Sequence, residues 1–503
     1  MALADLWARC LIGLGLCFHP AAGSAQAVDA KVVAAAPALI GAEAARADLR
    51  ALYAGLQSAQ YALYARTSKT VLDRAFRETL LALDHPMPRA EVQARFQRFV
   101  ARVRVAHTRI AFPAAAFGSY TEAGGKIFPL DVRIDAGRVY VVGNRSGRAD
   151  IAVGDQIVRI DGKRMPELLA RLGRNVSADT PYLAHSIIEY RLPGYLWLEF
   201  GARDDFDVMV RRIDGSARNI RLASRTLAEI AVAGPAPQTD PPRAAKMLPG
   251  AIAYLRPGPF YNLDPAANPW DTKDFVAFVD TAFGSFIAAK ATTLLIDLRN
   301  NPGGDSSFSD PMVAWFASRP FRFVSDFRIR ISAETIAANR SRLAAATKDG
   351  VVDQVSPRLA SVYTTAVPGS IRSFPVALTP PRTGRRFAGS VYLLIDRYSY
   401  SNTVNVAAIV QDYRFGTILG EETTDLATTY GAMESFTLPR TGISVGYAKA
   451  MLIRPNGSLV PRGIVPDIAL RAPIGANGDA MLDSALVVIR ARERARGYRH
   501  ASR

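Results

Sequence analysis

Two apolar segments of this chain each end in a polar loop and then continue into a helix-like pattern. The first is TTLLIDLRNNPGGD, over 292–305, and the second is VYLLIDRYSYSN, over 391–402. Near-continuous apolar strands that alternate with helices are typical of a parallel sheet covered on both faces. The pattern therefore predicts an α/β core. In such a sheet the loops after the strands meet at the carboxyl edge, where ligands bind, so we expect the two polar loops to be neighbours.

The N-terminal half has different periodicities. Apolar residues recur at helical spacing between 71 and 103, whereas short alternating strands with Asp-Gly turns begin near 124. The segment ADIAVGDQIVRIDGKRM, over 149–165, resembles the centre of a PDZ domain, and 234–250 is rich in proline. We therefore expect a signal peptide over 1–27, a helical N-terminal domain over 28–123, a PDZ-like domain over 124–226, a linker over 227–249, the α/β core over 250–475, and a C-terminal helix with a basic tail over 476–503.

The N-terminus has the pattern of an export signal. An apolar stretch follows Arg9, and AGSAQA supplies a small-residue cleavage site after Ala27. No other stretch reaches the ~20 apolar residues of a membrane span. We therefore expect an exported protein, periplasmic or secreted, without a membrane span.

Composition excludes several kinds of site. Both cysteines, Cys10 and Cys17, lie in the signal, so the mature chain is expected to lack disulfides and thiolate ligands. The five histidines are far apart, and we expect no metal and no other cofactor. The net charge of +17 is spread along the chain instead of forming a stripe, so nucleic acid is not an expected partner.

The two polar loops carry residues suited to acyl transfer. Gly303 and Gly304 have no Cβ, so a substrate can approach their N–H groups closely. Ser401 precedes a helix, where free N–H groups and the helix dipole favour a developing anion. A serine before a helix is also a common N-cap, and Pro-Gly-Gly is a common turn. On the residues alone both interpretations stay open.

Several ordered motifs resemble the tail-specific, or C-terminal processing, serine proteases. They are TLLIDLRNNPGGD, LLIDRYSYSNTVNVAAIVQDYRFGTILGEET and GSLVPRGIVPDIAL, behind the PDZ-like segment. The resemblance implies a ClpP/crotonase-like α/β protease core, with Ser401 as nucleophile. It also implies an oxyanion hole from the backbone N–H groups of Gly303, Gly304 and Asn402. The implied substrates are proteins or peptides, which the PDZ-like domain would bind by strand addition.

The chain departs from both branches of that family. In the Ser–Lys branch the lysine follows the GE-x-T segment, but the matching position here is Leu426. In the tricorn-like branch the base is a histidine before the PDZ domain, which His107 matches, with an expected pKa near 6.5. That branch also has a serine and a glutamate where this chain has Ala106 and Val460.

The missing partners leave two questions open. Glu421 and Glu422 are candidate carboxylates for orienting His107, and Lys449 is a further candidate base. The leading hypothesis is an exported serine endopeptidase that uses Ser401 and His107. The alternative is a peptide- or ligand-binding protein that keeps the same scaffold without turnover. The sequence leaves the natural substrates and the oligomeric state open.

Overall fold

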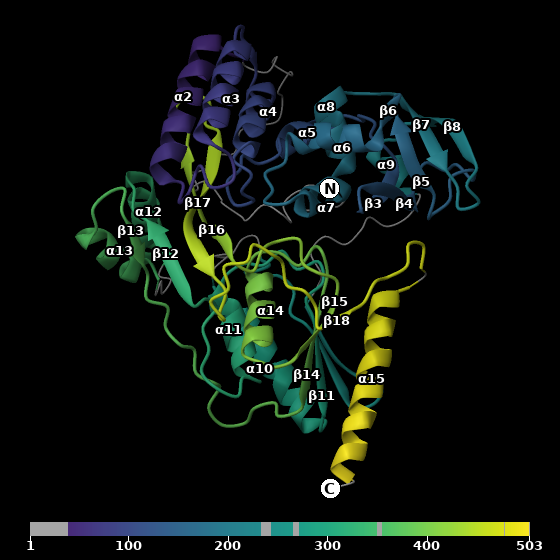
Figure 1. Ribbon diagram of the computed structural model, residues 1–503, viewed down its shortest axis with the longest axis vertical. Coiled ribbons are helices and arrows are strands. Elements are labelled where there is room, and N and C mark those ends of the chain that lie inside the picture. The colour runs from purple at the N-terminus through teal and green to yellow at the C-terminus, as the bar shows by residue number, and fades with distance from the viewer. Residues whose placement is uncertain (1–38, 233–242, 265–270, 350–354, 477, 502–503) are drawn as a thin grey trace, which may run out of the picture.

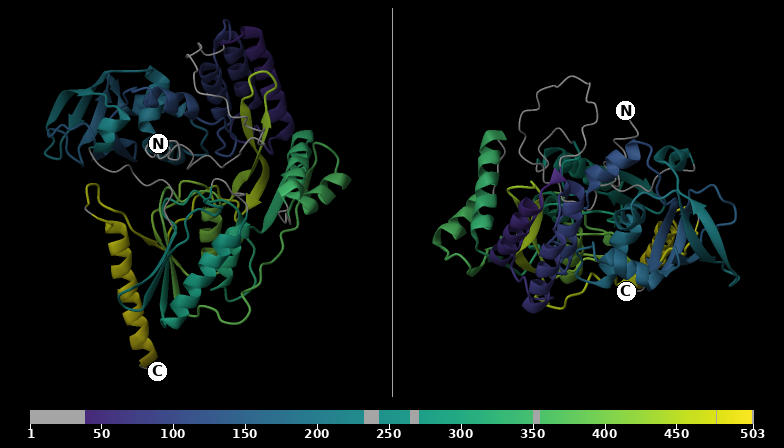
Figure 2. Two further views of the ribbon diagram at one scale, coloured as in Figure 1. Left: turned by 180° about the vertical axis from the view of Figure 1, so that it is seen from behind. Right: turned by 90° about the horizontal axis from the view of Figure 1, so that it is seen from above.

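The computed structural model describes residues 39–232, 243–264, 271–349, 355–476 and 478–501. A helical bundle and a β-rich unit lie side by side on one end of an α/β core (Figure 1), and the view from behind shows the same arrangement (Figure 2). The expected signal peptide, 1–27, lies outside the described residues. No helix in the described part of the chain is long and apolar enough to cross a membrane.

The core is built on one six-stranded sheet with the order β18-β15-β14-β11-β10-β9. The pairs from β10 to β18 are parallel, and β9 is antiparallel to β10. The strands are β9 (Ala244–Leu248), β10 (Ile252–Arg256), β11 (Thr293–Asp297), β14 (Ser390–Ile395), β15 (Thr417–Gly420) and β18 (Ile468–Ala469). This confirms the predicted α/β core and its parallel-rich sheet. The expected linker over 227–249 is wrong at its end, because β9 pairs with β10 and forms the edge of the sheet.

Both faces of the core sheet are covered, which explains the near-continuous apolar strands. Leu294 and Ile296 of β11 pack under three helices, while Leu295 faces a fourth helix on the other side. The three helices are α10 (Lys273–Ala288), α11 (Ser306–Ala314) and α14 (Asn402–Asp412), and the fourth is α15 (Ala480–Ala501). In Figure 1 α15 stands alongside the sheet. Met481, together with Ala485 and Ile489, is buried against the sheet, so α15 is part of the core and not only a carrier of the basic tail.

The β-rich unit contains an antiparallel sheet with the order β3-β4-β5-β7-β8, in which β6 pairs with β5, and helices pack against this sheet. Its buried residues also include Ala106 and Tyr400, so chain segments from outside the unit insert into its core. Its elements are β3 (Leu130–Asp135), β4 (Arg138–Asn144), β5 (Gln156–Ile160), β6 (Lys163–Arg164), α6 (Met165–Gly173), α7 (Pro181–Tyr190), α8 (Leu192–Phe200), β7 (Asp205–Arg211) and β8 (Ala217–Ala223).

The helical bundle packs on a long hairpin that rises from the core. Leu49 and Phe96 of the bundle share one buried cluster with Tyr447 of the hairpin. The helices are α2 (Ala42–Ala59), α3 (Lys69–Ala82) and α4 (Arg89–Ala101), and the hairpin is β16 (Thr429–Thr437) with β17 (Ser444–Ile453). Helix α3 begins where sequence periodicity predicts, because the Ser68 hydroxyl accepts the N–H of Val71.

The hairpin also extends into a small second sheet with the order β13-β12-β17-β16. Two helices cover this sheet where the sequence shows no clear pattern, between 320 and 385. The remaining elements are β12 (Asp326–Arg330), β13 (Ile371–Ser373), α12 (Ala333–Asp349), α13 (Ser356–Thr365), β1 (Leu39–Ile40), β2 (Met87–Pro88), α5 (Ala114–Glu122) and α9 (Leu227–Val232).

Candidate active site

Ser401 occupies a strained turn between β14 and α14. Its backbone angles are φ 55° and ψ −123°, a conformation that non-glycine residues rarely adopt. Its side chain makes no capping hydrogen bond with the helix that follows. The N-cap interpretation therefore fails in this structure. The turn has the conformation that, in a strand-to-helix nucleophile elbow, presents a hydroxyl away from the helix backbone.

A buried carboxylate holds the strained turn in place. Asp425 Oδ2 accepts the Ser401 N–H at 2.8 Å, and Asp425 Oδ1 accepts the N–H of Leu426 at 2.9 Å. Burial raises the pKa of Asp425 to about 6, although both hydrogen bonds favour the charged form. Sequence reasoning missed this residue. The only signal was its place next to Leu426, the position at which one branch of the family has a lysine.

The Pro-Gly-Gly turn lies directly against Ser401, as its predicted place at the sheet edge requires. Gly303 has φ 92°, and a Cβ built on it would lie 2.6 Å from Tyr400 O, 2.8 Å from Asn402 N and 2.9 Å from Ser401 Cβ. Such distances leave no room for a side chain. The two loops pack this closely because Gly303 has none.

The backbone donors of the predicted oxyanion hole are not equivalent. The N–H of Gly303 already donates to Asn301 Oδ1 at 3.0 Å. For the N–H groups of Gly304 and Asn402, no acceptor is found within the described residues. These two N–H groups are therefore free to bind an added oxygen. Gly303 instead allows the Pro-Gly-Gly turn to pack closely against the Ser401 loop.

Further hydrogen bonds fix the two loops to each other. The Tyr400 N–H donates to Asn301 O at 3.0 Å, and the Ser399 hydroxyl donates to Leu298 O at 2.9 Å. The two serines of the loop thus differ in role. Ser399 is buried and links the ends of two adjacent strands by its hydrogen bond, while Ser401 is partly exposed.

His107 lies beside the same loop. Its ring stacks on Tyr400, with 5.5 Å between ring centroids and an interplanar angle of 20°. Its Nδ1 atom is buried with no hydrogen-bond partner among the described residues. The backbone of Tyr430 favours the charged form of the ring, but this effect is smaller than that of burial. No hydrogen bond joins His107 to Ser401 in the described part of the chain.

Burial and the neighbouring Arg109 lower the pKa of His107 to about 4, well below the value of 6.5 expected from sequence. The attraction of Asp179 opposes this shift but does not cancel it. His107 is therefore neutral at pH 7 and available to accept a proton.

A second buried carboxylate fixes the backbone before His107. Asp179 Oδ2 accepts the N–H of Ala106 at 3.0 Å, and Arg66 Nε lies 3.1 Å from Asp179 Oδ1. Burial raises the pKa of Asp179 above its usual range. Nothing in the sequence points to Asp179, because it is separated from His107 by 72 positions and follows an ordinary helix.

The structure gives the other sequence candidates different surroundings. Glu421 pairs with Arg397 and Arg133, and Glu422 pairs with Arg462, so neither carboxylate contacts His107 within the described residues. Lys449 is buried at 2.5 Å from Glu434 Oε1, and burial lowers its pKa. Two remaining positions are Leu426, which is buried, and Val460, which is exposed. No group of three or more His, Cys, Asp or Glu side chains in the described ranges is placed to hold a metal ion.

Comparisons with known proteins identify a family match and a similar fold. Residues 270–470 match the family model "Peptidase family S41". The structure of mature CPAF complexed with lactacystin covers 85% of this chain and 94% of its own, at 18% identity and a TM-score of 0.56. The photosystem II D1 C-terminal processing protease covers 85% of this chain and 93% of its own, at 18% identity and a TM-score of 0.42. A search of curated proteins found no match. Residues 270–470 therefore form a peptidase family S41 domain, and the protein is a serine-type peptidase.

Proposed function

We propose that this protein is an exported endopeptidase in which Ser401 is the nucleophile and His107 is the general base. The observation that carries the proposal is the strained backbone of Ser401 at the head of α14, with Gly303 packed against it. Strain of this kind costs of order 1–3 kcal/mol and persists only where the surroundings enforce it. Here Asp425 and the Pro-Gly-Gly turn enforce it around a hydroxyl that caps nothing.

The proposed chemistry follows from the donors beside the hydroxyl. Ser401 Oγ bonds to the scissile carbonyl carbon while His107 takes the hydroxyl proton. The carbonyl oxygen becomes an oxyanion, which the free N–H groups of Gly304 and Asn402 stabilise. The C–N bond then breaks as His107 returns the proton to the leaving amine. Water attacks the acyl-enzyme by the same route and releases the second product.

His107 is in the neutral form that a general base requires, although a pKa of about 4 makes it a weaker base than an ordinary imidazole. Burial keeps the ring neutral, and Nδ1 has no partner among the described residues, so this nitrogen is free to accept a proton. The stacking of the ring on Tyr400 places it beside the residue that precedes Ser401. A direct hydrogen bond between base and nucleophile is often absent without substrate, and the proposal requires it to form when substrate binds.

The alternative is a protein that binds peptides on the same scaffold without cleaving them. Ala106 and the exposed Val460 favour this alternative, since they leave His107 without the partners typical of the tricorn-like branch. Mutation separates the two functions. Cleavage of an unfolded protein such as casein should be abolished in Ser401→Ala and in His107→Ala, and the double mutant should be little worse than either. A wild-type protein that binds casein but leaves it intact would support the alternative.

We also propose that the β-rich unit is PDZ-like and binds the substrate chain, and that the protein is periplasmic or secreted. The sheet of the β-rich unit has β3 and β8 at its two edges, and strand addition requires a free edge strand. A peptide that binds at one of these edges should inhibit the cleavage of casein but not the hydrolysis of a small activated ester. N-terminal sequencing of the exported protein should begin near residue 28. An intact N-terminus recovered from the cytosol would contradict the proposed location.

A further inference from the structure

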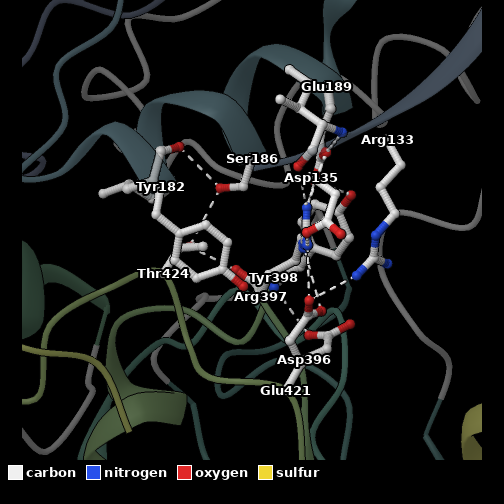
Figure 3. Close-up of polar contacts among 12 residues, drawn as sticks. Arg133, Asp135, Tyr182, Ser186, Glu189, Asp396, Arg397, Tyr398, Glu421 and Thr424 are labelled. Carbon is white, nitrogen blue, oxygen red and sulfur yellow. Dashed lines mark hydrogen bonds and ion pairs between the residues drawn. The ribbon is translucent and has the colours of Figure 1, made fainter. Parts of the chain in front are cut away.

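Arg397 is a charged residue in the Ser401 loop that is almost completely enclosed. It lies four positions before Ser401 and two positions after the end of β14, and is 1% exposed. Figure 3 shows its guanidinium between residues of the β-rich unit and residues of the core. A buried charge is strongly unfavourable unless it is paired, so the partners of this guanidinium determine where the loop can lie.

The β-rich unit supplies the first set of partners. Arg397 Nη1 donates to Ile134 O at 2.8 Å and lies 3.2 Å from each carboxylate oxygen of Glu189. Glu189 Oε1 accepts the Tyr398 hydroxyl at 2.6 Å, so the same carboxylate holds two consecutive residues of the Ser401 loop. Glu189 belongs to α7, and its Oε2 also accepts the N–H of Ile134 in β3 at 2.5 Å. The carboxylate is thus itself fixed by two elements of the β-rich unit.

The core supplies the second set of partners. Arg397 Nη2 donates to Glu421 Oε1 at 2.8 Å, and Arg133 Nη2 donates to the same oxygen at 2.7 Å. The carbonyl of Arg397 accepts the Thr424 hydroxyl at 2.6 Å. Thr424 is adjacent to Asp425, whose carboxylate holds the Ser401 N–H. Arg397 is therefore linked to the strained turn at Ser401 through Thr424 and Asp425.

The guanidinium also borders a cavity at this junction. A cavity of about 430 Å³ adjoins the guanidinium, and its lining includes Asp135, Tyr182, Arg397, Glu421, Glu422 and Arg471. The ring of Tyr182 lies 5.3 Å from the Arg397 guanidinium carbon and covers one face of it. Because the cavity leaves space at this boundary, loss of an ion pair would give the loop room to move.

We infer that Arg397 and Glu189 are positioning residues, which set the Ser401 hydroxyl for reaction by pinning its loop to the β-rich unit. This inference rests on the proposed function, because it assumes that Ser401 is the nucleophile. Neither side chain touches the reacting atoms. Both act through the backbone of 397–401, and a shift of about 1 Å in such a loop is enough to lower a rate by about 10²-fold.

The test compares two variants with a matched control. Glu189→Gln keeps the shape and the acceptor for Ile134 N–H but removes the charge opposite Arg397, and Arg397→Met removes the cation. The control is Arg454→Met. Arg454 pairs with the buried Asp412 at 2.6 Å, but at the far end of α14 and within the core. Each full-length protein is treated with a small fluorophosphonate, and the rate of adduct formation at Ser401 is measured by mass spectrometry beside the thermal midpoint.

We expect labelling to slow at least ten-fold in Glu189→Gln and about 10²-fold in Arg397→Met. Arg454→Met should be labelled at close to the wild-type rate, even if its thermal midpoint falls as far as those of the two test variants. If Glu189→Gln reacts at the wild-type rate, or if Arg454→Met slows equally, the inference is overturned. A wild-type protein that does not react would instead overturn the proposed function. In that case hydrogen exchange over 397–403 still tests whether Glu189 and Arg397 hold the Ser401 loop in position. Faster exchange in Glu189→Gln than in Arg454→Met supports this role, and equal exchange rejects it.

Discussion

A single methyl group added at Gly303 should disable the site without unfolding the protein. The Cβ of Gly303→Ala would lie 2.6 Å from Tyr400 O, 2.8 Å from Asn402 N and 2.9 Å from Ser401 Cβ. All three atoms belong to the proposed nucleophile loop, so the overlap is relieved only if that loop moves away by several tenths of an ångström or more.

The expected loss has two components that can be separated. Placing alanine at φ 92° costs about 1–2 kcal/mol in stability wherever it occurs. Displacing the reacting group is the second component, and misplacement by about 1 Å lowers a rate by about 10²-fold. Gly215→Ala is the matched control, since Gly215 has φ 85° but no atom within 4 Å of an added Cβ.

Casein cleavage and thermal unfolding of the two variants should therefore diverge. We expect the thermal midpoint to fall in both variants, and further in Gly303→Ala because of the overlap. We expect kcat/KM to fall about 10²-fold in Gly303→Ala and to stay unchanged in Gly215→Ala. A Gly303→Ala enzyme with wild-type kcat/KM would refute the reasoning. It would mean that the contact between the two loops is not needed for the reaction.

Three further outcomes are expected. Since burial lowers the pKa of His107 to about 4 and the neutral ring is the base, kcat/KM should rise as pH increases through about 4; a rise centred near 6.5 would show that the ring is solvated during catalysis or is not the base. Asp425→Ala leaves the N–H groups of Ser401 and Leu426 without their acceptor, at a cost of roughly 1–3 kcal/mol for each donor. The free energy of unfolding, measured by urea denaturation, should therefore fall by roughly 2–6 kcal/mol. Ser401→Ala and His107→Ala should each reduce casein cleavage by on the order of 10⁴-fold, with the double mutant similar; additive losses would contradict a cooperating pair.

The core could be predicted from sequence because its pattern is local. The apolar runs around 294 and 393 read as buried parallel strands, and the loops that follow them do meet at one edge of the sheet. The same pattern places Gly303 and Ser401 in these two loops. Strand β9 is not predicted because it is short and lies within the proline-rich stretch, and its strand character comes from pairing with β10.

The carboxylates around the site could not be predicted in the same way. Asp425 and Asp179 each bind a backbone N–H from a distant part of the chain, and nothing in their local sequence separates them from solvated loop acids. Glu421 was singled out for its place after β15, but its partner is Arg397 and not His107. Periodicity identifies which residues are buried, whereas the partner of a buried charge depends on tertiary contacts.

The central claim is that Ser401 is a reactive nucleophile, and covalent labelling tests it most directly. Wild-type protein treated with a fluorophosphonate, digested and analysed by mass spectrometry should carry one adduct, on the peptide that contains Ser401, and Ser401→Ala should carry none. His107→Ala should be labelled far more slowly than the wild type. A wild-type protein that is folded by circular dichroism yet acquires no adduct, or acquires it on another residue, would contradict the account.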